Sequence, residues 1–462
     1  MSRNDERTGR GIQLRLHCVT IEDLVPQEHF LRKLENAVDF SFIYDEVRDL
    51  YCSDNGRPSI DPVVLVKYLL VGYLYGIESE RRIEQEIQVN MAYRWFLGIE
   101  LDERVPDHST ISQLRRRKFN GTGLFRRLFE HVLFQCVNKG LVDGKIILTD
   151  STHVKANAST RANTRVMVEL EATDYMERLD RYEAEERERL EETGAIKPKR
   201  TSKTKKEPQR VEKTLSATDP DAGMLHRPGK PGGMHYLSHQ SVDSEHGIVV
   251  DVAVTAGSAN DSVAYLERIE YMREHLGLDI ETAGADSAYG TSMIYRAMED
   301  MGIQLHTPPN STGGATYKVE LRREDFNYDE ETDCFMCPMG HALTLRSLER
   351  EQHNICRVYR ANRKDCRDCP MLEKCVSESH RSRSIRVNIF EESVKRQRET
   401  DGTPEHKRIL TLRQIRCEGS FAAQKWMHNL RRLFRRGQEA AETHGLLSAT
   451  ALNLRRMVKC LG

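Results

Sequence analysis

Two aspartates in this sequence each follow a short apolar segment of the kind that forms a buried strand. Asp150 ends the run K-I-I-L-T-D, which Gly144 precedes as a turn signal. Asp286 follows the run E-T-A-G-A in a similar setting much later in the chain. Catalytic groups in open α/β sheets gather at the carboxyl ends of strands, and carboxylates are the ligands that hard divalent cations prefer. We therefore predict a metal site for phosphodiester chemistry; the alternative is that Asp150 merely caps a turn.

A third acid, Glu418, lies in a helical and basic region near the end of the chain. Glu418, Phe421, Ala422 and Lys425 recur at helical spacing, which predicts that Glu418 and Lys425 share one helix face two turns apart. Four arginines are predicted to extend this helix as a phosphate-binding stripe: Arg431, Arg432, Arg435 and Arg436. The alternative is that Glu418 is only an ion-pair partner among these cations. We predict that Asp150, Asp286 and Glu418 converge in space.

Six of the eleven cysteines fall between Cys334 and Cys375. Two C-x-x-C pairs at this spacing can close a tetrahedron of thiolates around zinc, and a full set of thiolates leaves no open position, which indicates a structural role. Six cysteines and His341 compete for four places; the favoured ligands are Cys337, Cys366, Cys369 and Cys375, with Cys334 as the substitute. The alternative is a set of reduced, buried cysteines.

Composition constrains the partners of this 462-residue chain. Its hydrophobic content of 38% and charged content of 31% suit a polar globular protein of two to three domains. The net charge of −1 provides no global attraction to nucleic acid, so binding must depend on local basic patches. The first residues lack a secretory signal, and the most apolar run, Val63 to Tyr75, is interrupted by Lys67 and too short to span a bilayer. We expect a cytoplasmic, nucleoid-associated protein.

Residues 31–140 are predicted to be helical. Asp61 and Pro62 form a helix start signal, and Asp107 precedes another helix that ends in four basic residues. This second helix is similar to the second helix of a helix-turn-helix, with Arg115, Arg116 and Arg117 placed to meet DNA phosphates. The alternative is a solvated basic helix end that favours its own dipole.

The remaining pattern predicts a mixed α/β sheet that carries two insertions. Strand-like and helical segments alternate from His235 to His306. Before them lies a highly charged helix followed by the segment Lys197 to Lys206, whose run of basic residues predicts a mobile stretch. The expected domains are a helical DNA-binding and dimerisation domain (1–140), the first part of a catalytic domain (141–309, with a charged insertion at about 161–225), the cysteine-rich insertion (310–410) and closing helices (411–462).

Several motifs, in this order, resemble those of insertion-sequence transposases of the DDE class. They are R-P-S-I-D-P-V-V-L-V-K-Y-L-L-V-G-Y-L-Y-G (57–76), V-P-D-H-S-T-I-S (105–112), D-S-T-H-V-K-A-N-A (150–158), V-T-A-G-S-A-N-D-S (254–262), A-D-S-A-Y-G (285–290), C-E-G-S-F-A-A-Q-K (417–425) and H-G-L-L-S-A-T-A-L-N-L-R-R-M (444–457). The resemblance implies a ribonuclease H-like fold with Asp150, Asp286 and Glu418 as the acidic triad. Some relatives carry a tyrosine and an arginine before the glutamate, where this chain has Thr411 and Gln414, although Arg413 and Arg416 are near.

Such a site would cleave the ends of an element and join the exposed 3′-hydroxyls to target DNA. Two Mg²⁺ ions about 4 Å apart would neutralise the entering and leaving oxygens. The implied partners are terminal inverted repeats and target DNA, bound by at least a homodimer whose interface we place on the amino-terminal helices. Two alternatives stay open: a DNA-binding remnant without catalysis, and a metal-dependent nuclease without strand transfer. A Tyr- or Ser-based recombinase is disfavoured because no tyrosine lies in a recognisably activating setting.

Overall fold

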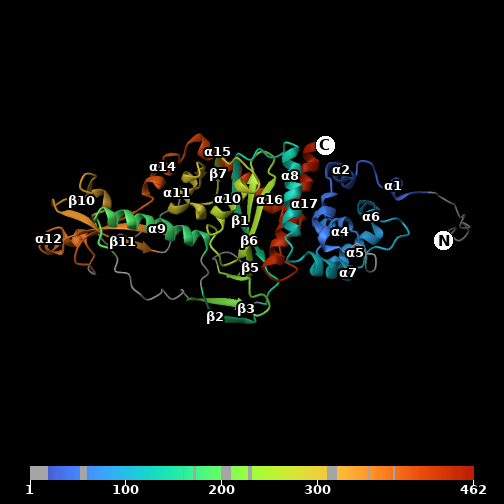
Figure 1. Cartoon of the computed structure of the whole chain (residues 1–462), viewed down its shortest axis with the longest axis horizontal. Helices are drawn as coiled ribbons and strands as arrows, with labels where there is room; N and C mark the ends of the chain where they lie inside the picture. The colour runs from blue at the N-terminus through green and yellow to red at the C-terminus, as the bar shows by residue number, and fades with distance from the viewer. Residues whose placement is uncertain are drawn as a thin grey trace, which may run out of the picture.

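The computed structural model of the chain describes residues 19–51, 60–159, 161–169, 173–198, 210–226, 232–309, 320–351, 354–377 and 380–462. The molecule is elongated, with amino-terminal helices at one end, a mixed sheet with flanking helices in the middle and a second sheet at the other end (Figure 1). Much of the predicted basic segment Lys197 to Lys206 lies outside the described residues. The predicted domain limits stay predictions.

The amino-terminal part is helical, as predicted. Its α-helices are α1 (Ile21–Leu24), α2 (Phe30–Ala37), α3 (Phe42–Val47), α4 (Pro62–Leu74), α5 (Glu80–Val89), α6 (Met91–Leu97), α7 (His108–Leu114) and α8 (Leu124–Asn138). The Asp61 carboxylate accepts hydrogen bonds from the first amides of α4, and Asp107 accepts one from Ser109 at the start of α7, so both predicted caps are confirmed. In the part of the chain that the structure describes, no helix combines the length and apolarity needed to cross a bilayer.

The central sheet is mixed, as predicted. It contains β1 (Ile146–Lys155), β4 (Gly223–Leu225), β5 (Gly233–Asp243), β6 (Val249–Ala256), β7 (Thr282–Gly284) and β8 (Gln304–His306). Strand β5 pairs antiparallel with both β1 and β6, whereas β7 lies parallel to β1 and β8 lies parallel to β7. Helices α10 (Tyr265–Glu274) and α11 (Ser292–Asp300) follow β6 and β7 in the chain. This arrangement places the predicted strand before Asp150 beside the predicted strand before Asp286.

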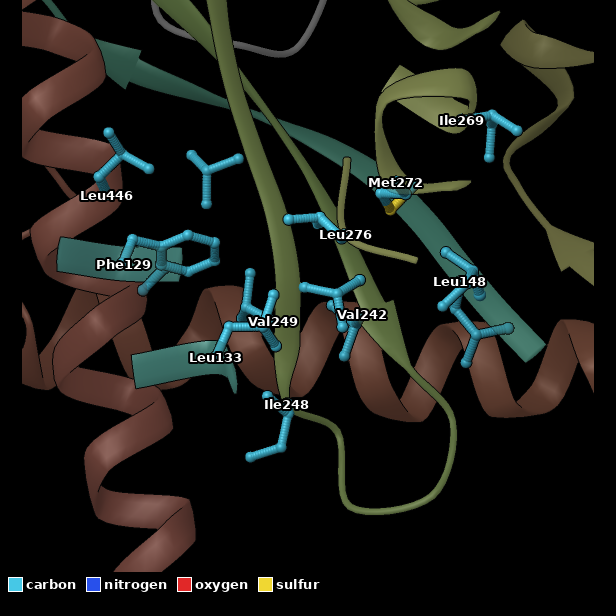
Figure 2. Packing of buried hydrophobic residues seen from close by; sticks show 14 of the residues in the cluster. Phe129, Leu133, Leu148, Val242, Ile248, Val249, Ile269, Met272, Leu276 and Leu446 are labelled. Atoms are coloured by element: carbon cyan, nitrogen blue, oxygen red, sulfur yellow. The ribbon is translucent and has the colours of Figure 1, made fainter. Parts of the chain in front are cut away.

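The core of this sheet is formed by aliphatic side chains from strands and helices that are far apart in sequence. Figure 2 shows Phe129 and Leu133 of α8 and Leu446 near Val249 of β6. Leu446 belongs to α17 (Gln438–Leu461), which packs against α8, α4 and β6. Because this last helix contacts both the amino-terminal helices and the sheet, it fixes one against the other through apolar burial.

A hairpin, a long helix and a second sheet extend from the central sheet. Strands β2 (Asn163–Glu169) and β3 (Arg210–Ser216) form a separate hairpin, and α9 (Asp174–Glu192) is the predicted charged helix. An antiparallel sheet contains β9 (Asn327–Asp329), β10 (Cys334–Met336), β11 (Ala342–Glu351), β12 (Asn354–Ala361) and β13 (Ser384–Asn388). Helix α9 joins this second sheet through ion pairs, among them Arg357 with Glu186 at 2.6 Å, and it lies along the sheet in Figure 1.

The carboxyl-terminal region corrects one prediction from the sequence. Helix α15 (Pro404–Arg413) continues through a π-helical turn, η5 (Gln414–Glu418), into α16 (Gly419–Met427), but residues 428–437 are not helical. Asn429 adopts a left-handed φ of 62°, and its side chain donates to the carbonyls of Gly72 and Ile77 at 3.1 Å. Lys155 at the end of β1 then forms a bridge with Arg432. The four predicted arginines therefore lie on a loop beside β1, and not on a helix.

Buried histidines fill the junction between this loop and the amino-terminal helices. His444 of α17 shares a hydrogen bond of 2.9 Å with the Tyr73 hydroxyl, and His428 contacts the Tyr73 carbonyl oxygen at 2.8 Å. Burial lowers the pKa of both histidines to about 4, and burial lowers the pKa of His239 in β5 to about 4 as well. All three side chains are therefore neutral in the folded protein at mildly acidic pH.

We expect the free energy of unfolding to decrease as the pH falls from about 6.5 towards about 4. Unfolded histidines take up protons near pH 6.5, whereas His239, His428 and His444 do so in the folded state only near pH 4. The unfolded state then binds more protons, and each histidine contributes a loss of about 2 kcal/mol by pH 5. Urea titrations at pH 7 and pH 5 measure this loss. The variant His444→Gln should show about one third less pH dependence, and equal stability at both pH values would contradict the prediction.

Candidate active site

Asp150 and Asp286 lie next to each other because of the register of two parallel strands. The last pairs between β1 and β7 are Ile147 with Ala283 and Leu148 with Gly284. Asp150 lies two residues further along β1, and Asp286 lies two residues beyond the end of β7, where it caps the 3₁₀ turn η3 (Ser287–Tyr289). The charge of Asp286 influences the Asp150 carboxyl, so the two acids are near each other. Asp150 is in the middle of β1 and not near its end as predicted, because β5 pairs with β1 as far as Lys155. It does lie just beyond the end of the parallel pairing.

Helices α15 and α16 cover the face of β1 that carries Asp150. A Cβ on Gly284 would lie 2.7 Å from Ile409 Cγ2, so this glycine allows α15 to approach β7 closely. The Cys417 thiol lies 3.4 Å from the Leu148 carbonyl oxygen, which brings η5 onto β1. Further along, Lys425 of α16 donates to the Thr152 hydroxyl at 2.5 Å. Lys425 is therefore on the same side of β1 as Asp150, as the alternation of strand side chains requires.

Arg413 neutralises part of the negative charge at this site. Its Nη1 lies 2.7 Å from Asp150 Oδ2, and the amide of Ser151 donates to Asp150 Oδ1 at 2.8 Å. Burial raises the pKa of the Asp150 carboxyl, and the neighbouring Asp286 raises it further, whereas Arg413 and the Ser151 amide oppose the increase. Two acids that repel each other in a partly desolvated place form a site that favours a bound cation.

Glu418 lies on the helical segment that covers the Asp150 face of β1. It is the last residue of η5, its side chain is exposed, and its neighbour Cys417 is in contact with β1. Burial raises the pKa of the Cys417 thiol most, and the charges of Asp150 and Glu418 raise it further. A π-helical turn inserts one residue into the helix, and such turns are frequent at functional sites.

The predicted triad does not form a compact ligand cluster in this structure. Among the described residues, one group of three metal-ligating side chains has its ligand atoms within 4.8 Å of one another, and it consists of Glu84, Asp107 and His108. There the His108 ring nitrogen and the Glu84 carboxylate are hydrogen-bonded at 2.6 Å. Neither the acidic triad nor the cysteine cluster meets this spacing.

The predicted DNA-binding arginines separate into exposed and buried members. The structure corrects the prediction for Arg115: this first residue of the π-helical turn Arg115–Phe119 has a side chain only 6% exposed, which pairs with Glu80 of α5 at 2.8 Å. Arg116 and Arg117 are exposed. In the carboxyl-terminal loop Arg431, Arg432 and Arg436 are exposed and Arg435 is half-buried. The Arg431 guanidinium lies 4.7 Å from the ring centre of Trp426, which is itself 76% exposed.

The predicted zinc site stays a prediction, but four of its cysteines are near enough for their thiols to influence one another. Burial raises the pKa of the Cys375 thiol; Arg383 opposes this increase, and the neighbouring thiols of Cys366, Cys369 and Cys337 add to it. The backbone amide of His341 donates to Cys337 Sγ at 3.3 Å, a contact that stabilises a thiolate ligand. These observations fit a thiolate-bound zinc ion. Cys356 instead faces Glu349 and Asn388 across β12, and Cys334 Sγ lies 3.1 Å from the Thr332 hydroxyl.

Sequence reasoning missed the residues that surround Asp150. It noted Arg413 only as a nearby cation, and it assigned no role to Asp261, although both lie in or beside quoted motifs. The Ser151 hydroxyl donates to the buried Asp261 carboxylate at 3.1 Å. Burial is the main cause of the raised pKa of the Tyr289 hydroxyl, and the charges of Asp261 and Asp150 raise it further. The Ser151 side chain is thus held by Asp261 on the face of the sheet opposite Asp150.

Two family descriptions match parts of the chain. Residues 19–117 match "Transposase domain (DUF772)", and residues 336–458 match "Transposase DDE domain". The second range contains Glu418, Lys425 and the four clustered cysteines, whereas Asp150 and Asp286 lie outside both ranges. These matches place transposase domains in two parts of the chain and confirm the resemblance of its motifs to those of DDE transposases.

Solved structures similar to the chain are also transposases. One is titled "Cryo-EM structure of piggyBac transposase synaptic complex with hairpin DNA (SNHP)", at 8% identity and a TM-score of 0.36, with 93% of this chain and 75% of that chain covered. Another is "Crystal structure of the Mos1 mariner paired end complex with Mn", at 10% identity and a TM-score of 0.16, with 56% and 62% covered. No curated protein sequence matches the chain.

Proposed function

We propose that the chain cleaves the ends of an insertion element and joins the 3′-hydroxyls to target DNA, using Asp150, Asp286 and Glu418 in a ribonuclease H-like fold. The observation that supports this proposal is that Asp150 of β1 and Asp286, two residues past the end of the parallel neighbour β7, lie near each other beneath the helical segment that carries Glu418. Carboxylates held on or directly beside strands and helices are positioned more precisely than carboxylates on loops.

The donor set at this site fits magnesium. Asp150, Asp286 and Glu418 offer only carboxylate oxygens, which Mg²⁺ prefers, and the pKa of Asp150 is raised where a cation would relieve the repulsion. Bound divalent ions would supply charge neutralisation during phosphodiester cleavage and transfer. The four clustered cysteines would hold a separate structural zinc ion.

The exposed cations near the site would bind the DNA backbone. Lys425 contacts β1 on the Asp150 face, and the loop after α16 presents Arg431, Arg432 and Arg436. Because these side chains would neutralise phosphates, DNA affinity should depend strongly on salt. Arg435, Arg116 and Arg117 are secondary candidates. Synapsis of two element ends requires at least a homodimer, and we place its interface on the amino-terminal helices.

Purified protein incubated with Mg²⁺ and labelled duplexes that carry the ends of its element tests this function. We expect cleavage at the element end and covalent joining of the exposed 3′ end to a target plasmid. Cleavage without joining would instead support a nuclease of the same fold. Binding without any cleavage would support a DNA-binding remnant. A control duplex with a scrambled end should be neither cleaved nor joined.

A further inference from the structure

Arg413 has an unusual position for an arginine of a DNA-binding protein. Its side chain is 14% exposed, it ends α15, and its Nη1 contacts Asp150 Oδ2 at 2.7 Å. Its Nε is also buried and has no hydrogen-bond partner among the described residues. Arg416, one turn later, instead donates to the backbone carbonyls of Ser244 and Glu245 and is fixed in place. Arg413 therefore depends mainly on one carboxylate, and that carboxylate belongs to the proposed catalytic site.

The two oxygens of Asp150 are both in use. Oδ1 accepts the amide of Ser151 and Oδ2 accepts Arg413, so the ion pair covers the oxygen that points towards the helices. A guanidinium and a divalent cation on one carboxylate oxygen repel each other at short range, in a place where water screens poorly. A buried arginine whose Nε–H has no acceptor is also stabilised when that group forms a hydrogen bond with a second acceptor.

We propose that Arg413 is an exchangeable counter-ion of Asp150. This inference rests on the proposed function. Arg413 pairs with the Asp150 carboxylate in the metal-free, DNA-free protein and leaves Oδ2 when a divalent cation binds there. The planar guanidinium then binds a phosphate of the DNA end, for which its fork of donors is suited. Arg413 is thus a positioning residue that couples two binding events.

This exchange makes metal and DNA binding mutually favourable. A metal ion that displaces Arg413 frees a cation for the DNA, and DNA that captures Arg413 frees Asp150 for the metal. The two effects are equal in size because binding equilibria are reciprocal. The site would then be fully formed only when the DNA end is present.

Titration of the full chain with Mn²⁺ in the absence of DNA, with free Mn²⁺ followed by electron paramagnetic resonance, tests this proposal. We expect R413Q to bind Mn²⁺ roughly tenfold more tightly than the wild type, the scale of one charge-assisted hydrogen bond. R413K keeps the charge and should remain within about threefold of the wild type. The control R408Q removes an exposed arginine of the same helix, paired with Glu405, and should change nothing.

Two outcomes separate this inference from the proposed function. If R413Q binds Mn²⁺ no more tightly than the wild type while D150N loses the binding, Arg413 does not compete with the cation. This result overturns the exchange of Arg413 and leaves the proposed function intact. If D150N retains the same Mn²⁺ affinity, Asp150 is not a ligand and both are overturned. Melting curves confirm folding, and R413K provides the comparison if R413Q is unstable.

Discussion

Replacing Asp150 with asparagine is expected to abolish cleavage of element ends while DNA binding remains. Asparagine has the size of aspartate and can still accept the Ser151 amide, so β1 should retain its pairing with β5 and β7. It lacks the negative charge that a hard divalent cation requires. A loss of several kcal/mol of transition-state stabilisation corresponds to a rate reduction of about 1,000-fold or more. Single-turnover nicking of a labelled end measures the rate, and fluorescence anisotropy measures the affinity.

The controls for this prediction use two other aspartates of the same sheet. Asp286→Asn should behave like Asp150→Asn, because Asp286, two residues past the end of β7, is the acid next to Asp150. Asp243 of β5 is fully buried and accepts the Gly144 and Glu245 amides, so Asp243→Asn tests stability without touching the proposed site. It should keep nicking within a few-fold of the wild type. Persistent nicking by Asp150→Asn would falsify its assignment as a metal ligand.

Local sequence patterns were sufficient to predict the helical amino-terminal part and several strands of the central sheet. The aliphatic run before Asp150 and the glycine before Lys145 determine β1, and Asp61 and Asp107 determine where two helices begin. These signals act within a few residues, so no knowledge of distant contacts is required. The mixed α/β class followed from the alternation of such segments.

Long-range contacts explain what the sequence could not predict. The extension of β1 past Asp150 depends on its pairing with β5, some ninety residues later in the chain. The loop that carries Arg431 and Arg432 breaks the helical pattern because Asn429 is held by carbonyls of the amino-terminal helices. Likewise, Arg115 is buried because Glu80 of another helix faces it. In each case tertiary contacts override a local preference.

The role of Arg413 shows the same limit within the candidate site. Its sequence distance from Glu418 suggested only a nearby cation, one position away from where some relatives have an arginine. Its contact with Asp150 arises because Gly284 allows α15 to lie close to β7, which aims the end of the helix at β1. No spacing rule connects a glycine, an aspartate and an arginine that lie so far apart. The geometry of the packed helix is required.

The variant Cys366→Ser is expected to lose the zinc ion that we propose for the cysteine cluster. Wild-type protein should contain about one zinc per chain, held by Cys337, Cys366, Cys369 and Cys375, and replacement of one thiolate should reduce this content to near zero. Zinc binding contributes directly to the folding of small metal domains. The short helices that carry Cys366 and Cys375 should therefore become sensitive to proteases, as they should when a chelator removes zinc from the wild type. Elemental analysis and limited proteolysis measure both effects.

Cysteines of the same sheet provide matched controls for this experiment. Cys356 lies on β12 between Glu349 and Asn388, away from the cluster, so Cys356→Ser should retain zinc. Cys334→Ser decides whether Cys334 substitutes for Cys337: its thiol contacts Thr332, and we expect zinc to be retained. If wild-type protein contains no zinc, or if Cys356→Ser loses as much as Cys366→Ser, the cluster is a set of reduced cysteines. The second sheet would then depend on its apolar core alone, including the buried Phe335 and Tyr359.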